Sequence, residues 1–146
     1  MSTSDRDAPA GGFREIDHSG DAGLEVWGTT LPALLQHATR GLCALMTFSA
    51  VEPTVTRRIE VQAESLEDLL VDWLSAVILS SATHGELYAR AEVVVSEDVV
   101  ASGVIFGEPL DPARHALRFD VKAATYHELV MEESADGYHA RIIFDL

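Results

Sequence analysis

The order of helical and strand-like hydrophobic patterns is the feature that most restricts how this chain can fold. Two helical patterns lie before Gly85, and most of the chain after Gly85 is rich in β-branched and aromatic residues. Runs of strands that follow helices indicate an α+β protein, because α/β folds alternate the two along the chain. We therefore expect an α+β fold: a single domain with a largely antiparallel β-sheet and two amphipathic helices packed on one face.

The two helices have clear sequence boundaries. Residues 31–46 carry apolar side chains at the i, i+3, i+4, i+7 spacing of an amphipathic helix, with Thr30 as the expected N-cap. The second helix is expected to begin after Ser65 and to end at Gly85, a residue that favours helix termination. Its apolar stripe includes Trp73, which we expect in the core.

Strand patterns occupy most of the remaining chain. Turn-forming residues separate the strand patterns, and residues 1–12, which are small, polar and contain Gly and Pro, predict a flexible lead-in before a domain that spans 13–146. The expected strands are residues 13–17, 24–27, 58–63, 87–95, 99–106, 119–126, 129–132 and 138–144.

Composition and charge exclude several classes of function. The 146 residues include 24 Asp and Glu against 10 Lys and Arg, a net charge of -14, so direct binding to nucleic acid is not expected. The single cysteine, Cys43, cannot form an internal disulfide or a multi-thiolate zinc site. No apolar run is long enough for a membrane span, and the first residues lack a signal-peptide pattern, so a cytoplasmic protein without membrane contact is expected.

The residues do not contain the usual signatures of an enzyme. A nucleophile elbow, a phosphate-binding glycine loop, a zinc-protease motif and paired-cysteine motifs are all absent from the sequence. The six histidines show no spacing typical of metal ligands. Taken alone, none of these residues identifies a catalytic site.

The acidic segment DHSGDAG, residues 17–23, is the first candidate site. It forms a Gly-containing turn between two expected strands and carries Asp17, His18 and Asp21. A short loop can direct carboxylates at a hard cation, which prefers several oxygen ligands. From local sequence alone, a polar turn in which Asp17 or Asp21 accepts hydrogen bonds from main-chain amides is the favoured interpretation, because such turns are common.

The carboxyl end of the chain is the second candidate site. An apolar strand pattern continues to the last residue, so the carboxylate of Asp145 lies next to the terminal carboxylate of Leu146. Neighbouring carboxylates repel one another unless a cation or a hydrogen-bond donor lies between them. A chain that merely stops at the edge of a sheet explains this pattern as well.

Five motifs, in the same order, resemble the archease family. The opening DHSGDAG corresponds to the D/E-H-T/S-A-D-x-G pattern of that family, with Gly20 where alanine is common. The resemblance covers nearly everything after residue 12. The other four motifs are VEP at 51–53, EDLLVDWL at 67–74, GEPLDP at 107–112 followed by His115, and VKAATYH at 121–127.

The resemblance implies a specific metal site and a specific partner. Archeases have an α+β fold and bind a divalent metal through positions that correspond here to Asp21, Asp145 and the terminal carboxylate of Leu146. Oxygen ligands of this kind suit calcium, magnesium or manganese. Supporting contacts are expected from Asp17, His18 and His127.

The function that the resemblance implies is activation of an RtcB-class RNA ligase. Archease promotes the GTP-dependent guanylylation of that ligase and its multiple turnover in tRNA splicing and RNA repair, and is not itself an enzyme. Two alternatives remain open at this point: a metal-dependent hydrolase that uses the same acidic cluster, and a general protein-binding chaperone module.

Overall fold

Both expected helices form, and their first residues are capped as the sequence indicates. The computed structural model describes residues 12–97 and 99–146; the expected lead-in therefore lies, apart from Gly12, outside the described residues. Helix α2 spans Leu31–Met46, and Thr30 Oγ1 accepts a hydrogen bond from Ala33 N at 3.2 Å. Helix α3 spans Leu66–His84 and is capped in the same way by Ser65.

Gly85 ends α3 because it adopts a left-handed conformation. Its φ of 63° is accessible to glycine without a steric penalty, and its N–H donates to Ser81 O at 2.8 Å. The termination predicted from the sequence is therefore confirmed. Within the described residues, neither helix combines the length and the apolar character that a transmembrane helix requires.

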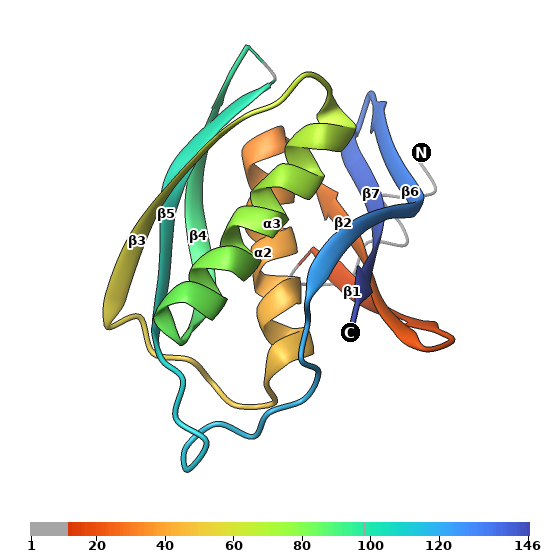
Figure 1. Ribbon diagram of the computed structural model, residues 1–146. Coiled ribbons are helices and arrows are strands. Elements are labelled where there is room, and N and C mark those ends of the chain that lie inside the picture. The colour runs from red at the N-terminus through yellow and green to blue at the C-terminus, as the bar shows by residue number, and fades with distance from the viewer. Residues whose placement is uncertain (1–11, 98) are drawn as a thin grey trace.

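The strands form two antiparallel sheets (Figure 1). One has the order β1-β2-β7-β6 and the other β3-β5-β4. Every pairing between neighbouring strands is antiparallel. The strands are β1 Phe13–His18, β2 Asp21–Gly28, β3 Val55–Gln62, β4 Glu86–Ser96, β5 Val100–Pro109, β6 Ala123–Ser134 and β7 Gly137–Asp145.

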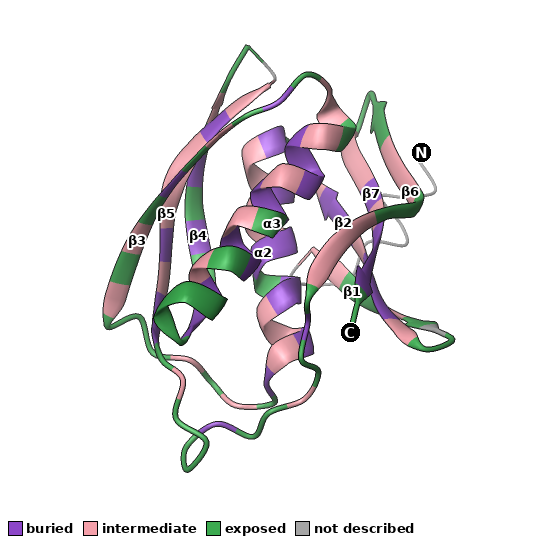
Figure 2. Cartoon of the chain, viewed as in Figure 1, coloured by how far each residue is buried: buried purple, intermediate pink, exposed green. Residues whose placement is uncertain are grey.

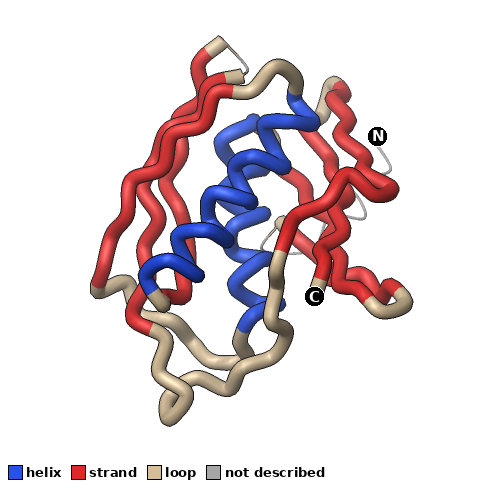
Figure 3. Tube along the Cα trace, viewed as in Figure 1, coloured by secondary structure: helices blue, strands red, loops and turns tan. Residues whose placement is uncertain are grey.

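The two helices lie between the two sheets (Figures 1 and 3). Helix α2 contacts β4 on one side and β2 on the other, and α3 contacts both β3 and β6. The α+β class and the antiparallel pairing are confirmed, whereas the expectation of one sheet with both helices on a single face is corrected. The physical reason is that α3 is buried on more than one side. It buries both Leu70 and Val71, and consecutive residues point about 100° apart around a helix.

One strand replaces two expected strands near the carboxyl end. Residues 119–126 and 129–132 were expected as separate strands, but β6 runs through both and begins only at Ala123. Its pairing with β7 shifts register between Thr125 and Val130, and Glu128 within this interval has a φ of 52°. The bulge accounts for the interruption between the two strand patterns.

The helices are joined in the core through Trp73. Its side chain is fully buried, and its indole N–H donates to Thr39 Oγ1 at 2.9 Å. Thr39 in turn donates to Leu35 O at 2.8 Å, so this hydroxyl is satisfied on both sides. Figure 2 shows that buried positions are concentrated on the helices and on the strands that face them. The core position expected for Trp73 is confirmed.

Replacing Trp73 by alanine is predicted to lower the free energy of unfolding by about 3–5 kcal/mol, because the change leaves a cavity between the helices. Trp73→Phe is the matched control: it keeps an aromatic ring and removes the hydrogen bond to Thr39. We expect it to cost less than the alanine substitution. Urea unfolding followed by circular dichroism measures both, and a Trp73→Ala protein as stable as the parent would contradict this packing.

A buried carboxylate anchors the long connection between β5 and β6. Glu108 accepts hydrogen bonds from the main-chain N–H of Glu52 and from the guanidinium of Arg114, and these contacts lower its pKa to about 2. His115 Nδ1 accepts from Asp111 N at 2.9 Å, so the proton of the neutral ring lies on Nε2, 3.3 Å from Glu108 Oε2. Glu108 thus ties two otherwise irregular segments to the end of β5.

The lowered pKa of Glu108 predicts a pH dependence of stability. Since the folded pKa lies below the ordinary value of about 4.3, ionised Glu108 stabilises the native state above that pH. The contribution is lost as pH falls towards 2. We expect Glu108→Gln to be less stable than the parent at pH 7 and to lose less stability between pH 5 and pH 3. The same substitution at exposed Glu60 is the control; unfolding midpoints that fall in parallel for parent and Glu108→Gln would refute the assignment.

Candidate functional site

Asp21 is positioned by a tight hairpin. Strands β1 and β2 pair in a register that sets Asp17 against Ala22 and His18 against Asp21. Only Ser19 and Gly20 remain for the turn, and Gly20 has a φ of 78°, which a side chain would disfavour. The expected turn between two strands is confirmed, and it places Asp21 at the first position of β2.

The register of β2 against β7 brings Asp21 to the carboxyl end of the chain. Ala22 pairs with Phe144, so continuation by one residue sets Asp21 opposite Asp145. Opposite residues of an antiparallel pair point to the same face, with Cβ atoms about 5 Å apart. Leu146 follows directly, so its terminal carboxylate belongs to the same end of the strand pair (Figure 1).

The chain does not end at a sheet edge. Strand β7 lies between β2 and β6 in the four-stranded sheet, and Asp145 pairs with Ala123 of β6. The carbonyl of Asp145 also accepts a hydrogen bond from Lys122 N at 2.9 Å. The alternative explanation, a chain that stops at an edge strand, is therefore wrong: β7 is an interior strand, and β6 pairs with it as far as Asp145.

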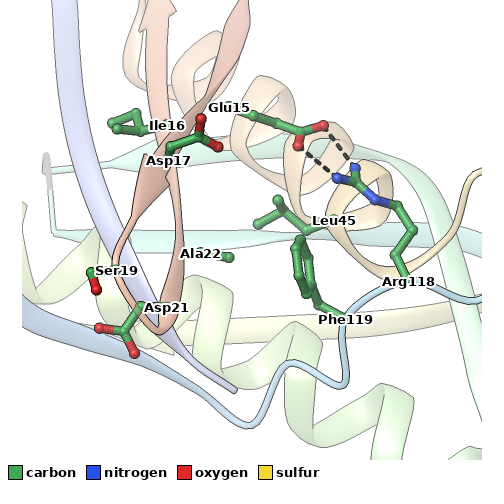
Figure 4. A pocket seen from close by; sticks show the side chains of 9 residues that line it. All are labelled: Glu15, Ile16, Asp17, Ser19, Asp21, Ala22, Leu45, Arg118 and Phe119. Carbon is green, nitrogen blue, oxygen red and sulfur yellow. Dashed lines mark hydrogen bonds and ion pairs between the residues drawn. The ribbon is translucent and has the colours of Figure 1, made fainter.

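A cavity of about 380 Å³ opens beside the hairpin (Figure 4). Asp17, Ser19 and Asp21 line it from the hairpin, and Arg118 and Phe119 line it from the β5–β6 connection. The remaining lining residues are Glu15, Ile16, Ala22 and Leu45. The cavity therefore presents carboxylates on one wall and a cation and an aromatic ring on another.

An ion pair crosses this cavity. Arg118 donates to both carboxylate oxygens of Glu15, at 2.9 and 3.0 Å, and to Ala44 O at 2.7 Å. The hydrogen bonds that Arg118 donates to Glu15 raise the pKa of Arg118 further above its ordinary value. The sequence analysis did not identify Glu15, Arg118 or Phe119 as site residues. Glu15 lies about a hundred residues before the other two, and no local pattern links it to them.

The other predicted site residues occupy different places. Asp17 is exposed and borders the cavity, but strand alternation puts it on the face opposite to Asp21. His18 is the register partner of Asp21. His127 is exposed in the irregular part of β6, four residues beyond the partner of Asp145, and its main-chain N–H donates to Thr125 Oγ1 at 3.3 Å.

The donor chemistry at the end of β2 and β7 is that of carboxylate oxygens alone. Within residues 12–97 and 99–146, no three His, Cys, Asp or Glu side chains lie close enough to hold a metal ion. The ligands expected from the sequence, Asp21, Asp145 and the terminal carboxylate of Leu146, include only two side chains, so they would not form a cluster of three. A set of this kind fits a hard divalent cation.

Comparison with known proteins covers nearly the whole chain. Residues 13–146 match the model of the Archease protein family (MTH1598/TM1083). The archease of Methanopyrus kandleri is 36% identical over 138 residues, which cover 92% of this chain and 99% of that protein. The archease of Thermococcus kodakarensis is 30% identical over 139 residues, with 92% and 98% covered.

Solved structures support the same relationship. The solution structure of Methanobacterium thermoautotrophicum protein 1598 superposes with a TM-score of 0.76 at 30% identity, covering 93% of this chain and 99% of that protein. A Thermotoga maritima protein described as an archease and possible chaperone shares the fold, with a TM-score of 0.62 at 20% identity over 91% and 96% of the two chains. By sequence and by fold, this chain belongs to the archease family.

Proposed function

We propose that this protein is a non-enzymatic activator of an RtcB-class RNA ligase, and that it binds a divalent cation for this role. Membership of the archease family supports the choice of partner. The observation that carries the proposal is the β2–β7 register, which joins Asp21 to Asp145 and Leu146 across the whole length of the chain.

The proposed ligands are carboxylates that the strand pairing brings near one another, and this favours a cation between them. Neighbouring like charges repel one another, and a divalent ion with oxygen ligands removes that repulsion. Strands β2 and β6 hold the main chain around Asp145, so ion binding costs little conformational entropy there. Calcium, magnesium and manganese suit this donor set, whereas zinc prefers nitrogen and sulfur ligands.

The placement of the site suits delivery to a protein partner. Asp145 and Leu146 are exposed and Asp21 is partly exposed, so another protein can reach them. A cation bound there would neutralise phosphate charge during GTP-dependent guanylylation of the ligase. The net charge of -14 repels RNA and favours a basic protein surface, so the ligase and not its RNA is the partner.

The two alternatives have weaker support. In a metal-dependent hydrolase a metal-bound water attacks, and the residues that line the cavity beside Asp21 include no histidine or lysine to assist it beyond the carboxylates themselves. A general chaperone is suggested by the description of the Thermotoga maritima protein, which shares only the fold with this chain at 20% identity.

Asp21→Asn is predicted to reduce at least tenfold the stimulation that this protein gives to guanylylation of the ligase. The substitution removes the charge of one metal ligand at nearly constant shape. The surface position keeps the change in stability below about 1 kcal/mol. The assay measures guanylylation of a purified RtcB-class ligase with GTP at low manganese, beside calorimetric titration of the protein with manganese. Asp136→Asn, in the exposed β6–β7 turn, is the matched control. Full activation by Asp21→Asn would show that the metal assignment is wrong.

Extra residues after Leu146 are predicted to weaken manganese binding and ligase activation, because they move the terminal carboxylate away from Asp21. Asp145→Asn should have the same effect. Leu146→Ala should be mild, since any last residue supplies a carboxylate, and the same extension before Met1 should have no effect. If the protein with a carboxyl-terminal extension binds manganese and activates the ligase fully, the chain end has no ligand role.

The same preparations distinguish the alternatives. Hydrolysis of a phosphate- or ester-containing substrate by this protein alone, lost in Asp21→Asn, would favour the hydrolase. Suppression of aggregation of unfolded proteins that is unaffected by Asp21→Asn, without stimulation of the ligase, would favour the chaperone module.

A further inference from the structure

Two segments that are distant in sequence form an exposed apolar surface beside the acidic cavity. The residues that follow α2 pair with the β5–β6 connection: Thr47 bridges Leu117, and Phe48 N donates to Ala116 O at 2.8 Å. The pairing leaves Phe48 73% exposed and Leu117 48% exposed. Together with Arg118 and the 38% exposed Phe119, these two residues make up what we call the aromatic patch.

Arg118 holds the aromatic patch in place. Its guanidinium lies 4.6 Å from the ring centroid of Phe48 and 5.1 Å from that of Phe119. Its hydrogen bonds go to Glu15 and to Ala44 O, so its charge is already matched within the molecule. The guanidinium therefore orients the two rings, and a partner that binds them finds a surface that is already ordered.

The patch is continuous with the acidic cavity. Phe119 and Arg118 belong to both, and the hairpin residues Asp17 and Asp21 border the same cavity (Figure 4). Folding does not explain the exposure of Phe48, whose ring contacts the patch and not the core. Neighbouring exposed apolar side chains that border a polar rim mark interaction surfaces.

We propose that the aromatic patch is the docking surface for the ligase, and that it receives a protein surface with an apolar socket bordered by lysine and arginine. This inference rests on the proposed function and adds the surface through which it acts. The apolar rings would enter the socket, and the carboxylate of Asp17, which borders the adjoining cavity, would face the basic border. Docking there brings the proposed cation site close to the partner, because Asp21 borders the same cavity.

Charge selects this occupant over two others. A second copy of this chain would bring two acidic cavities together, and each chain carries a net charge of -14. Aromatic rings can also stack on the bases of RNA, but phosphates next to these carboxylates would be repelled. A basic protein surface is the partner for which both apolar contact and charge attraction favour binding.

The test compares the double variant Phe48→Ser/Leu117→Ser with Leu79→Ser and Val94→Ser. The two controls lie on α3 and β4, outside the patch, and are 66% and 67% exposed. Fluorescence anisotropy with the labelled protein measures the Kd for a purified RtcB-class ligase, and a guanylylation titration measures activation. We expect the double variant to raise the Kd at least tenfold and to reach the activation plateau of the parent at saturation. The controls should stay within twofold of the parent, and only Asp21→Asn should lower the plateau.

The outcomes separate this inference from the proposed function. An unchanged Kd for the double variant, with normal activation by the parent, would overturn the docking surface alone. A parent that binds the ligase without activating it would overturn the proposed activation, and the Kd comparison would still decide the docking surface. A parent that does not bind would overturn both.

Further measurements test the chemistry of the partner. The Kd of the parent should rise as sodium chloride increases from 50 to about 300 mM, since salt screens the carboxylates from the basic border. A Kd independent of salt would overturn the basic border. Patch-dependent dimerisation in analytical ultracentrifugation, or RNA binding lost in the double variant, would overturn the choice of occupant. Phe48→Ala, a smaller change at the most exposed position, serves if the double variant does not fold.

Discussion

The pairing of β2 with β7 is the interaction on which the rest of the structure depends. It joins the first part of the chain to the last part and forms the centre of the four-stranded sheet. Its inner face places Leu24 opposite Ile142, and both are fully buried against the helices. A slip of one residue would turn these side chains outward, so burial of the inner face determines the register. The same register sets Asp21 opposite Asp145, and the candidate site is a consequence of core packing.

Placement of the helices between two sheets explains the internal contacts and the irregular segments. Because sheets cover α2 and α3 on both sides, Thr39 and Trp73 meet in the interior and satisfy each other's polar atoms. The connection from β5 to β6 has to pass around this core outside regular secondary structure. Glu108 and Arg118 hold it at its two ends, each through contacts with segments that precede β5. The aromatic patch exists because Arg118 is anchored in this way.

Acidic charge determines which kind of partner these surfaces favour. The cavity and the aromatic patch share Arg118 and Phe119, Asp21 borders the cavity, and the whole chain carries a net charge of -14. Such a surface repels nucleic acid and attracts basic proteins over distances of about a Debye length. A protein that serves an RNA-processing enzyme without binding RNA itself is consistent with that balance.

The sequence by itself determined the α+β class, the two helices with their caps, and most of the strands, because these depend on local periodicity and on single capping residues such as Ser65 and Gly85. Local pattern also marked the segment that holds Asp21 and the end that holds Asp145, but only the family resemblance linked them. The tertiary structure alone decided that there are two sheets, that the last strand is interior, and that Arg118 reaches Glu15 across the cavity. These contacts join residues about a hundred positions apart, and they arise when buried surfaces are packed together, a process that leaves no periodic signal at either residue.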